Sequence, residues 1–182
     1  MAIFINLLTI SRMALGAFIF ILLTRTEMYW IAFVLFFIAS ITDYFDGYLA
    51  RKYNHVSQIG EILDPIADKI LIVFLLFAIS VNLTSYYIGF ASSLIITREI
   101  WVGALRDFNA RQNKSDATKV TFLAKIKTTI QLFTISTYLL GLGMNNMLIL
   151  LIADMLLFLS VIITIYTGFI YSLNTFKKSQ ND

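Results

Sequence analysis

The feature that most constrains this chain is its division into apolar stretches that are each long enough to cross a membrane. Crossing the hydrocarbon core takes roughly 20 mostly apolar residues in an α-helix, and the 182-residue sequence holds about six such stretches. They run approximately over residues 4–23, 28–49, 62–83, 86–105, 123–142 and 147–172. Because they fill nearly the whole chain, we expect one all-α, polytopic membrane domain over residues 1–182 and no second, soluble domain.

Composition supports this class and excludes several others. Hydrophobic residues make up 59% of the sequence, charged residues 14%, and the mean hydropathy is +0.81, whereas a soluble domain is about 25% charged. The chain has no cysteine for thiolate catalysis, and its one histidine, His55, cannot supply a site of several imidazoles. No P-loop or Rossmann glycine pattern occurs. The start lacks a basic segment and a cleavage site, so we expect residues 1–23 to belong to the mature protein.

Basic residues predict the orientation of the helices. The connection after the first stretch holds Arg25, and the connections at 82–85 and 143–146 hold no Lys or Arg. The opposite side holds ten basic residues: Arg51, Lys52, Arg106, Arg111, Lys114, Lys119, Lys125, Lys127, Lys177 and Lys178. The positive-inside rule therefore predicts an inner-membrane protein with both termini and the active face in the cytoplasm. The net charge of +3 then reflects loops that face anionic lipid, not nucleic acid.

Acidic residues gather where the second stretch ends and the third begins. Five of the 11 lie within residues 43–68: Asp43, Asp46, Glu61, Asp64 and Asp68. Helical spacing puts Asp43, Asp46, Gly47 and Ala50 on one face of the second helix, and Gly60, Asp64 and Asp68 on one face of the third. Interfacial charge in membrane proteins is often merely solvated, but four aspartates on two consecutive helix faces favour a functional cluster.

Four carboxylates held close together repel one another unless cations compensate their charge, and two divalent ions would balance them. An all-oxygen set of Asp43, Asp46, Asp64 and Asp68 favours Mg²⁺ or Mn²⁺. In proteins these ions usually bind a few carboxylates together with substrate phosphates. The cluster therefore predicts phosphoryl transfer or a related diphosphate reaction.

Other residues of the two segments suit a phosphate-bearing substrate. Gly47 and Ala50 remove side-chain bulk from the aspartate face, and Arg51 can bind a phosphate. We expect Gly60 just before the third helix, where a helix N-terminus favours anions, and Pro65 in the first turn of that helix.

Together the two segments resemble the signature of the CDP-alcohol phosphatidyltransferases, D-x-x-D-G-x-x-A-R-(x)8-G-x-x-x-D-x-x-x-D. Every fixed position matches, including the gap over 52–59. The resemblance implies a homodimeric, Mg²⁺- or Mn²⁺-dependent membrane enzyme that displaces CMP from a CDP-linked lipid. It implies that the aspartates hold the metal ions, and that Asp68, beside Asp64, accepts the proton of the acceptor alcohol. It assigns the CDP group to Asp43, Asp46, Gly47, Ala50, Arg51 and Gly60.

Residues outside the signature resemble the branch of this family whose acceptor is sn-glycerol 3-phosphate. They are Asn6, Thr9, Arg12, Arg98, Glu99, Arg106 and the string Lys125-x-Lys127-Thr128-x-x-Gln131. Arg98 lies midway along an apolar stretch, where it either forms a structural ion pair with Glu99 or faces a cavity that needs a phosphate ligand. The resemblance implies that the acceptor phosphate is bound by Arg98, Lys125, Lys127 and Arg12. Gly16 differs from this branch, in which many members carry proline at the same position. The resemblance therefore does not predict whether the first helix bends there.

The implied reaction joins CDP-diacylglycerol and glycerol 3-phosphate to give phosphatidylglycerophosphate and CMP. Alternative acceptors are inositol phosphate, serine and phosphatidylglycerol, because the signature alone does not choose among them. A polyprenyl transferase with Asp-rich motifs is a rival enzyme, although it would carry two separated motifs in a longer chain. A divalent-cation transporter is the non-enzymatic rival, but its carboxylates should lie near the middle of the membrane.

Overall fold

The computed structural model describes residues 2–53, 58–112 and 122–179, and within these ranges the chain forms six α-helices and no strand. The helices are α1 (Ala2–Arg25), α2 (Tyr29–Tyr53), α3 (Gln58–Asn82), α4 (Tyr86–Arg111), α5 (Phe122–Gly143) and α6 (Met147–Ser179). Inside the helices the backbone alone is described at residues 2–6, 8, 43–53, 58–62, 64, 65, 68, 124, 125, 178 and 179. The prediction of an all-α chain with about six helices is confirmed.

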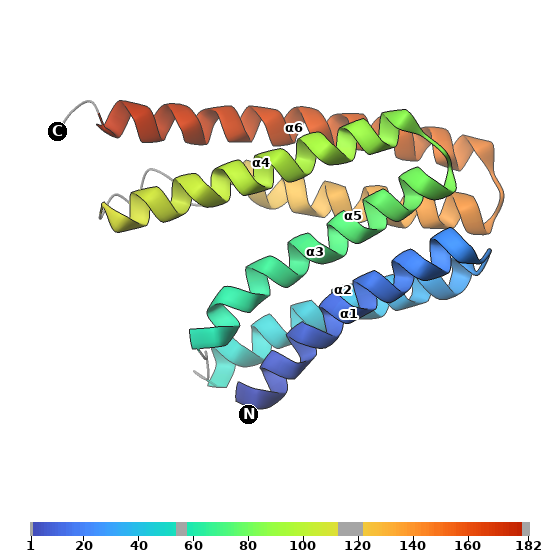
Figure 1. The fold of residues 1–182 in the computed structure, drawn as a ribbon, viewed down its shortest axis with the longest axis horizontal. Helices are drawn as coiled ribbons and strands as arrows, with labels where there is room; N and C mark the ends of the chain where they lie inside the picture. The colour runs from blue at the N-terminus through green and yellow to red at the C-terminus, as the bar shows by residue number, and fades with distance from the viewer. Residues whose placement is uncertain (1, 54–57, 113–121, 180–182) are drawn as a thin grey trace.

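The helices form a bundle with all three short turns at one end (Figure 1). Helix α1 packs against α2 and α3, α5 packs against α6 and α2, and α4 packs against α6 and α3. Toward the other end, the group of α1 and α2 diverges from the group of α4 and α6, and α3 runs between them (Figure 1). Helix α1 begins and α6 ends at this diverging end, as the even number of helices predicts.

The core of the bundle is built from buried apolar side chains of all six helices. Its fully buried side chains include Ile19, Leu75, Ile79, Tyr138 and Leu157. A Cβ atom built on Gly16 would lie 3.4 Å from the Leu71 Cα atom. The glycine therefore allows α1 to pack closely against α3, which gives a packing reason for glycine at this position.

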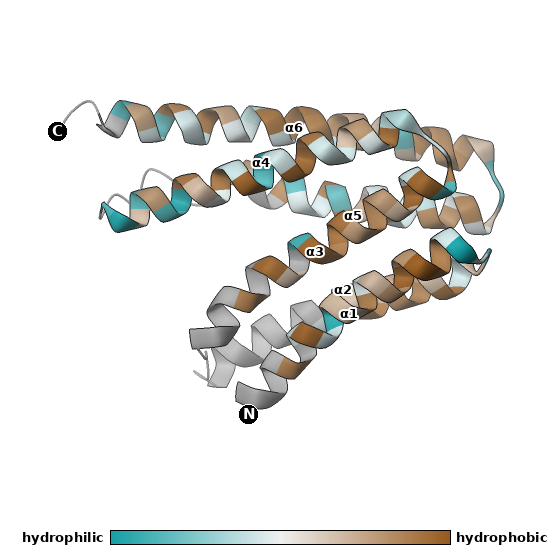
Figure 2. Cartoon of the chain, viewed as in Figure 1, coloured by the Kyte–Doolittle hydropathy of each residue, from teal (hydrophilic) through white to brown (hydrophobic). Residues whose placement is uncertain are grey.

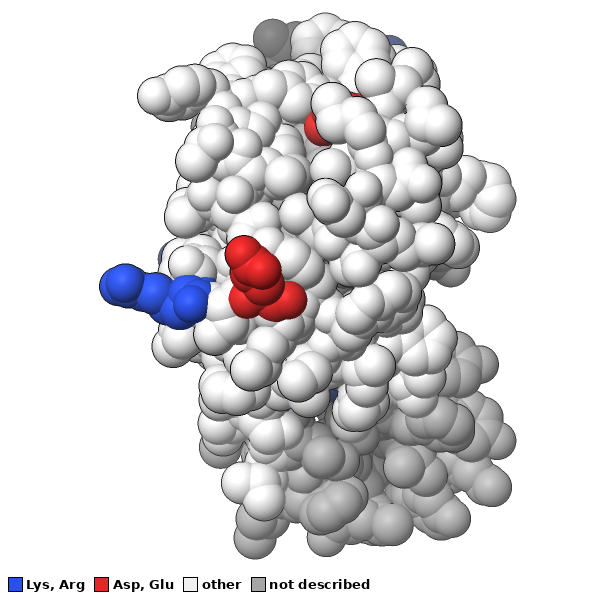
Figure 3. Space-filling model, turned by 90° about the vertical axis from the view of Figure 1, so that its right-hand side faces the viewer, with Lys and Arg blue, Asp and Glu red and all other residues white. Residues whose placement is uncertain are grey.

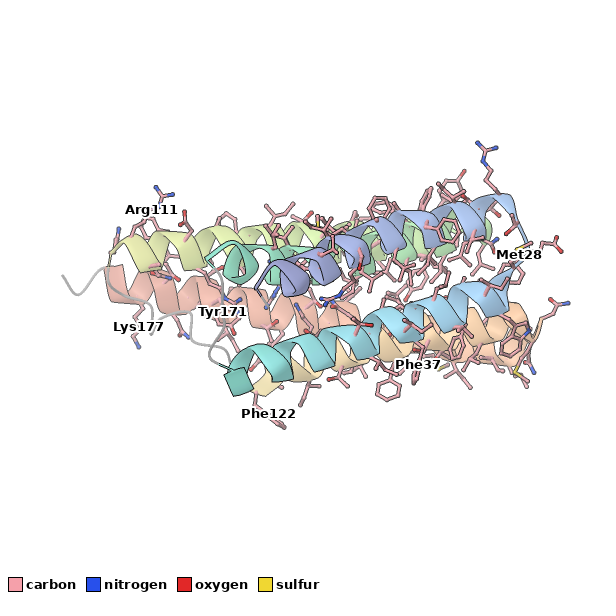
Figure 4. The ribbon with its side chains drawn as sticks, turned by 90° about the horizontal axis from the view of Figure 1, so that it is seen from below. Met28, Phe37, Arg111, Phe122, Tyr171 and Lys177 are labelled. Atoms are coloured by element: carbon pink, nitrogen blue, oxygen red, sulfur yellow. The ribbon has the colours of Figure 1, made fainter. Side chains whose placement is uncertain are left out.

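Apolar residues occupy most of the coloured length of the helices (Figure 2), and many of them are exposed. Exposed apolar side chains follow α6 from one end to the other: Leu148, Leu151, Met155, Phe158, Ile162, Ile165, Phe169, Leu173 and Phe176. Phe37 and Phe122 point away from the neighbouring helices (Figure 4). Tyr86–Arg111 and Met147–Lys177 are long and apolar enough to cross a membrane. Exposed apolar surface of this extent suits a lipid surrounding.

Charged residues separate along the bundle. The end with the short turns shows little charge (Figure 3), and the charged residues of the α1–α2 connection, Arg25 and Glu27, are exposed there. Arg111 and Lys177 lie at the opposite end, far from Met28 (Figure 4). The predicted orientation, with this basic end in the cytoplasm, stays a prediction.

Local sequence explains two of the short turns. The hydroxyl of Ser85 accepts a hydrogen bond of 3.3 Å from the Ile88 amide and caps the start of α4. The Asn146 side chain accepts one of 3.0 Å from the Leu148 amide at the start of α6. Asn145 has a φ of 48°, in the left-handed region that asparagine tolerates better than most residues. Polar residues thus replace the missing helical partners at these ends.

The helices extend further at the diverging end than apolarity predicts. Helix α2 continues past residue 49 to Tyr53, and α4 continues past residue 105 to Arg111. Two predictions about α3 are wrong: because it begins at Gln58, Gly60 lies inside the helix and Pro65 lies about two turns into it. The reason is that apolarity marks only the part at lipid depth, whereas helical hydrogen bonding continues through polar residues.

Candidate active site

A cavity of about 690 Å³ lies between α3, α4 and α5. Its polar lining consists mainly of four basic side chains, one carboxylate and one carboxamide: Lys69, Arg98, Arg106, Lys127, Glu99 and Gln131. The remaining wall is mostly apolar and includes Phe74 and Ile95. Ile66 and Ile100, which also line the cavity, are exposed on the outside of the bundle. The cavity therefore joins a strongly basic interior to an apolar rim.

Glu99 connects two of the cations across the cavity. Its Oε1 atom accepts a hydrogen bond of 3.0 Å from Nη1 of Arg98 and another from Nζ of Lys127. Arg98 is 8% exposed and Lys127 is 5% exposed. Burying two cations is costly unless they are paired, so the shared carboxylate explains how both can face the cavity from different helices.

Residues of α6 hold the guanidinium group of Arg98 in place by hydrogen bonds. Nε of Arg98 donates to the Thr164 carbonyl at 3.1 Å, and Nη2 donates to Oγ1 of Thr167 at 2.8 Å. The guanidinium also lies 5.6 Å from the centre of the Tyr171 ring, which is labelled in Figure 4. Arg106 approaches the same ring at 5.7 Å. One tyrosine of α6 thus supports two of the four cations by cation–π contacts.

Close packing and hydrogen bonds hold α4 against α6 around Arg98. A Cβ atom on Gly168 would lie 2.9 Å from Cγ of Arg98, so only glycine leaves room for the arginine stem. The Trp101 indole nitrogen donates to Ser172 Oγ at 2.8 Å, and the Asn109 amide donates to Thr175 Oγ1 at 2.8 Å. These interhelical bonds hold α4 in the rotation at which Arg98 and Glu99 line the cavity.

The structure brings together some of the predicted acceptor residues. Arg98 and Lys127 line one cavity, and the Arg98–Glu99 ion pair that the sequence offered as an alternative is present as well. Arg12 is buried in α1 and is not among the described residues that line the cavity. The side chain of Lys125 lies outside the described part of the chain. The assignments of Arg12 and Lys125 therefore stay predictions.

The predicted carboxylate cluster belongs to the ends of α2 and α3 that the short segment 54–57 joins. Helix α2 contains Asp43, Asp46, Gly47, Ala50 and Arg51, and α3 contains Gly60, Asp64 and Asp68, but these side chains lie outside the described part of the chain. Among the described side chains there is no group of three or more metal-ligating residues. The metal and CDP assignments therefore stay predictions.

The backbone nevertheless connects the two parts of the site. Ile66 and Lys69 line the cavity, and Asp68 lies between them in α3. Consecutive Cα atoms are about 3.8 Å apart. The predicted base therefore belongs to the same turn of helix as two cavity residues.

Sequence reasoning missed several members of the cavity. Lys69 directly follows the aspartate cluster and has the pattern of an ordinary interfacial cation. In the sequence, Arg106 counts only as an orienting basic residue and as part of the branch resemblance, and Gln131 only as part of that resemblance. The pairing of Glu99 with Lys127 joins α4 to α5 and has no local sequence signal, since the two residues are 28 positions apart.

Comparison with known proteins agrees with the signature. Residues 3–166 match the family model described as CDP-alcohol phosphatidyltransferase. The chain therefore belongs to the CDP-alcohol phosphatidyltransferase family, whose members are membrane-bound transferases, and the resemblance seen in the sequence is confirmed.

Three curated relatives carry the name CDP-diacylglycerol–glycerol-3-phosphate 3-phosphatidyltransferase. The protein of Rickettsia bellii is 42% identical over 143 residues, which cover 76% of this chain and 75% of the relative. That of Cereibacter sphaeroides is 39% identical over 150 residues, covering 78% and 65%. That of Escherichia coli is 34% identical over 134 residues, covering 72% and 73%. The acceptor branch indicated by the sequence agrees with these names.

Proposed function

We propose that this chain transfers the phosphatidyl group of CDP-diacylglycerol to sn-glycerol 3-phosphate, giving phosphatidylglycerophosphate and CMP. The names of its relatives support this reaction. The observation that supports the acceptor most directly is the cavity, in which four basic side chains face one carboxylate. A phosphate monoester dianion is the kind of ligand that such an excess of positive charge favours.

The positive charge of the cavity also favours some of the alternative acceptors over others. Serine carries one ammonium and one carboxylate group, so it would leave the excess of cations uncompensated and would place its ammonium group among them. Inositol phosphate satisfies the charge as well as glycerol 3-phosphate does. The choice between these two phosphorylated acceptors rests on the relatives, which are named for glycerol 3-phosphate.

The predicted metal ligands are Asp43, Asp46, Asp64 and Asp68. Their donor set consists of carboxylate oxygens alone, which fits Mg²⁺ or Mn²⁺, and members of the family generally depend on a divalent cation. Bound there, such ions would neutralise the diphosphate and stabilise the departing CMP. On the same helix faces, Gly47, Ala50, Arg51 and Gly60 would seat the cytidine and its phosphates.

The reaction then needs one proton transfer from the acceptor. The cavity cations hold the phosphate of glycerol 3-phosphate, and its terminal hydroxyl points toward the turn of α3 that contains Asp68. Asp68, beside Asp64, takes the hydroxyl proton as the oxygen attacks the phosphatidyl phosphorus. A new oxygen–phosphorus bond forms, the bond from that phosphorus to CMP breaks, and CMP leaves with the electron pair. No covalent intermediate with the protein is required.

The distribution of basic residues indicates on which face of the membrane the reaction takes place. We place the diverging end of the bundle at the cytoplasmic face of the inner membrane, since its connections hold the Lys and Arg residues. The apolar rim at Ile66 and Ile100 offers a path for acyl chains between cavity and bilayer. A homodimer, as the family resemblance implies, is part of the proposal.

Release of CMP tests this function. Purified protein in lipid–detergent micelles with CDP-diacylglycerol and Mn²⁺ should release CMP with glycerol 3-phosphate and not with serine. Inositol phosphate, used in a third arm, should give at most a small fraction of that rate. Equal rates with serine, or preference for inositol phosphate, would remove the acceptor assignment and leave the wider family activity. Mn²⁺ uptake into vesicles without CMP release would support a transporter instead.

A further inference from the structure

One polar group of the cavity has no partner in the described part of the protein. The side chain of Gln131 is 4% exposed, its amide nitrogen Nε2 is buried, and that nitrogen makes no hydrogen bond to the described residues. A buried amide without a partner is destabilising, and native proteins keep few of them. Gln131 lines the cavity, so a rotation of its carboxamide group would turn Nε2 toward the cavity, where a bound molecule can complete this hydrogen bond.

The position of Gln131 relates it to the acceptor site. It lies four residues after Lys127 on α5, so both side chains share one face of the helix. Arg98 and Glu99 face the same cavity from α4. Gln131 is therefore a neutral donor about one helical turn away from the Lys127–Glu99–Arg98 group that holds the charges.

One polar group of the acceptor, its C2 hydroxyl, is available as a partner for the Gln131 amide. Glycerol 3-phosphate consists of a phosphate, a terminal hydroxyl that reacts and a C2 hydroxyl that does not. The phosphate matches the four cations, and the terminal hydroxyl must reach the turn of α3 with Ile66 and Lys69, next to Asp68. The C2 hydroxyl lies between them and needs a neutral donor or acceptor.

We propose that Gln131 determines acceptor specificity by donating a hydrogen bond from Nε2 to the C2 hydroxyl oxygen of glycerol 3-phosphate. This inference rests on the proposed function and adds the group that recognises the unreactive part of the acceptor. A site that hydrogen-bonds a substrate hydroxyl discriminates strongly against the analogue without it, because the buried polar group is then left unpaired.

A cycle with two enzymes and two acceptors tests this contact. The enzymes are the parent protein and Gln131→Leu, which keeps a similar volume without polar atoms. The acceptors are glycerol 3-phosphate and 3-hydroxypropyl phosphate, which lacks only the C2 hydroxyl. For the parent, kcat/KM should fall at least about tenfold with the deoxy acceptor. For Gln131→Leu, kcat/KM with glycerol 3-phosphate should fall by a similar factor, and the two acceptors should become nearly equivalent.

Two further measurements distinguish loss of this contact from loss of folding or of CDP-diacylglycerol binding. The thermal unfolding midpoint and the KM for CDP-diacylglycerol should stay near the parental values in Gln131→Leu, since an unpaired amide is replaced by an apolar group. Gln131→Met keeps a similar length, removes the amide donor and acceptor, and should lose the same preference; it takes over the test if the leucine variant does not fold. Equal losses on both acceptors, or no loss on either, would overturn the contact. A parent protein inactive with glycerol 3-phosphate would instead overturn the proposed function itself.

Discussion

At the scale of single residues, the proposed acceptor site uses cations that the protein already pairs and that also face the cavity. Lys127 is bonded to Glu99 and also faces the cavity. Lys127→Ala leaves Glu99 paired with Arg98, so no buried charge loses its last partner. Losing one charge-assisted contact to the acceptor phosphate should cost roughly 1.5 to 3 kcal/mol. This corresponds to an increase of about 10- to 150-fold in the acceptor KM.

Steady-state kinetics with each substrate varied in turn measures this effect. The KM for CDP-diacylglycerol should change much less, because the proposed function places this lysine beside the acceptor. Lys177→Ala, an exposed lysine near the end of α6, is the matched control and should behave as the parent does. Arg98→Ala should raise the acceptor KM and also reduce stability, since its bonds to Thr164 and Thr167 disappear. A parental acceptor KM in both cavity variants would contradict the phosphate site.

Asp68 presents a second prediction at this scale. Asp68→Asn keeps an oxygen ligand but removes the base, so turnover at saturating acceptor should fall about 10²-fold or more. Binding of CDP-diacylglycerol, measured by calorimetry, should remain. Asp107→Asn is the control, because Asp107 is exposed on α4 and pairs with Arg111 at 2.8 Å. Parental turnover in the Asp68 variant would exclude this residue as the base.

At the scale of the helices, the rotation of α4 against α6 decides whether the cations face the cavity. Gly168 is a tight point of this contact, because a Cβ atom added there would lie 2.9 Å from Cγ of Arg98. Gly168→Ala should displace Arg98 and reduce the free energy of unfolding by about 1–3 kcal/mol, as overpacking usually does. It should also raise the acceptor KM.

Thermal unfolding in detergent compares this variant with Gly103→Ala. A Cβ atom on Gly103 meets only the Lys69 Nζ atom, at 3.9 Å, an ordinary contact. Alanine in a helix interior is favoured over glycine by about 0.5–1 kcal/mol, so this variant should be at least as stable as the parent. Equal stability of the two variants would show that the Gly168 contact does not constrain Arg98.

At the scale of the whole molecule, the described core contains none of the predicted metal ligands. The described core consists of apolar side chains such as Ile19, Leu75 and Leu139, none of which can bind a cation. EDTA should therefore abolish CMP release, whereas the helical circular dichroism signal should stay unchanged. Mg²⁺ or Mn²⁺ should restore turnover. Activity that survives the chelator would contradict the metal-dependent mechanism, and loss of helicity would contradict a metal-independent fold.

The sequence by itself determined the properties that neighbouring residues encode together. Six helices, their approximate positions and the family follow from apolar length and from one signature within residues 43–68, because lipid depth and helical spacing act along the chain. The same local signals misplaced the start of α3 and therefore put Gly60 before it, since helical hydrogen bonding does not end where apolarity ends.

Only the tertiary structure decided which distant side chains meet. Lys69, Glu99, Lys127 and Gln131 come from three helices, and their meeting depends on how those helices cross and rotate. Residues such as Gly16 and Gly168 set that rotation through close contacts with other helices. A glycine has the same local meaning whether it faces lipid or an arginine, so the sequence does not specify the shape of the cavity until the helices pack.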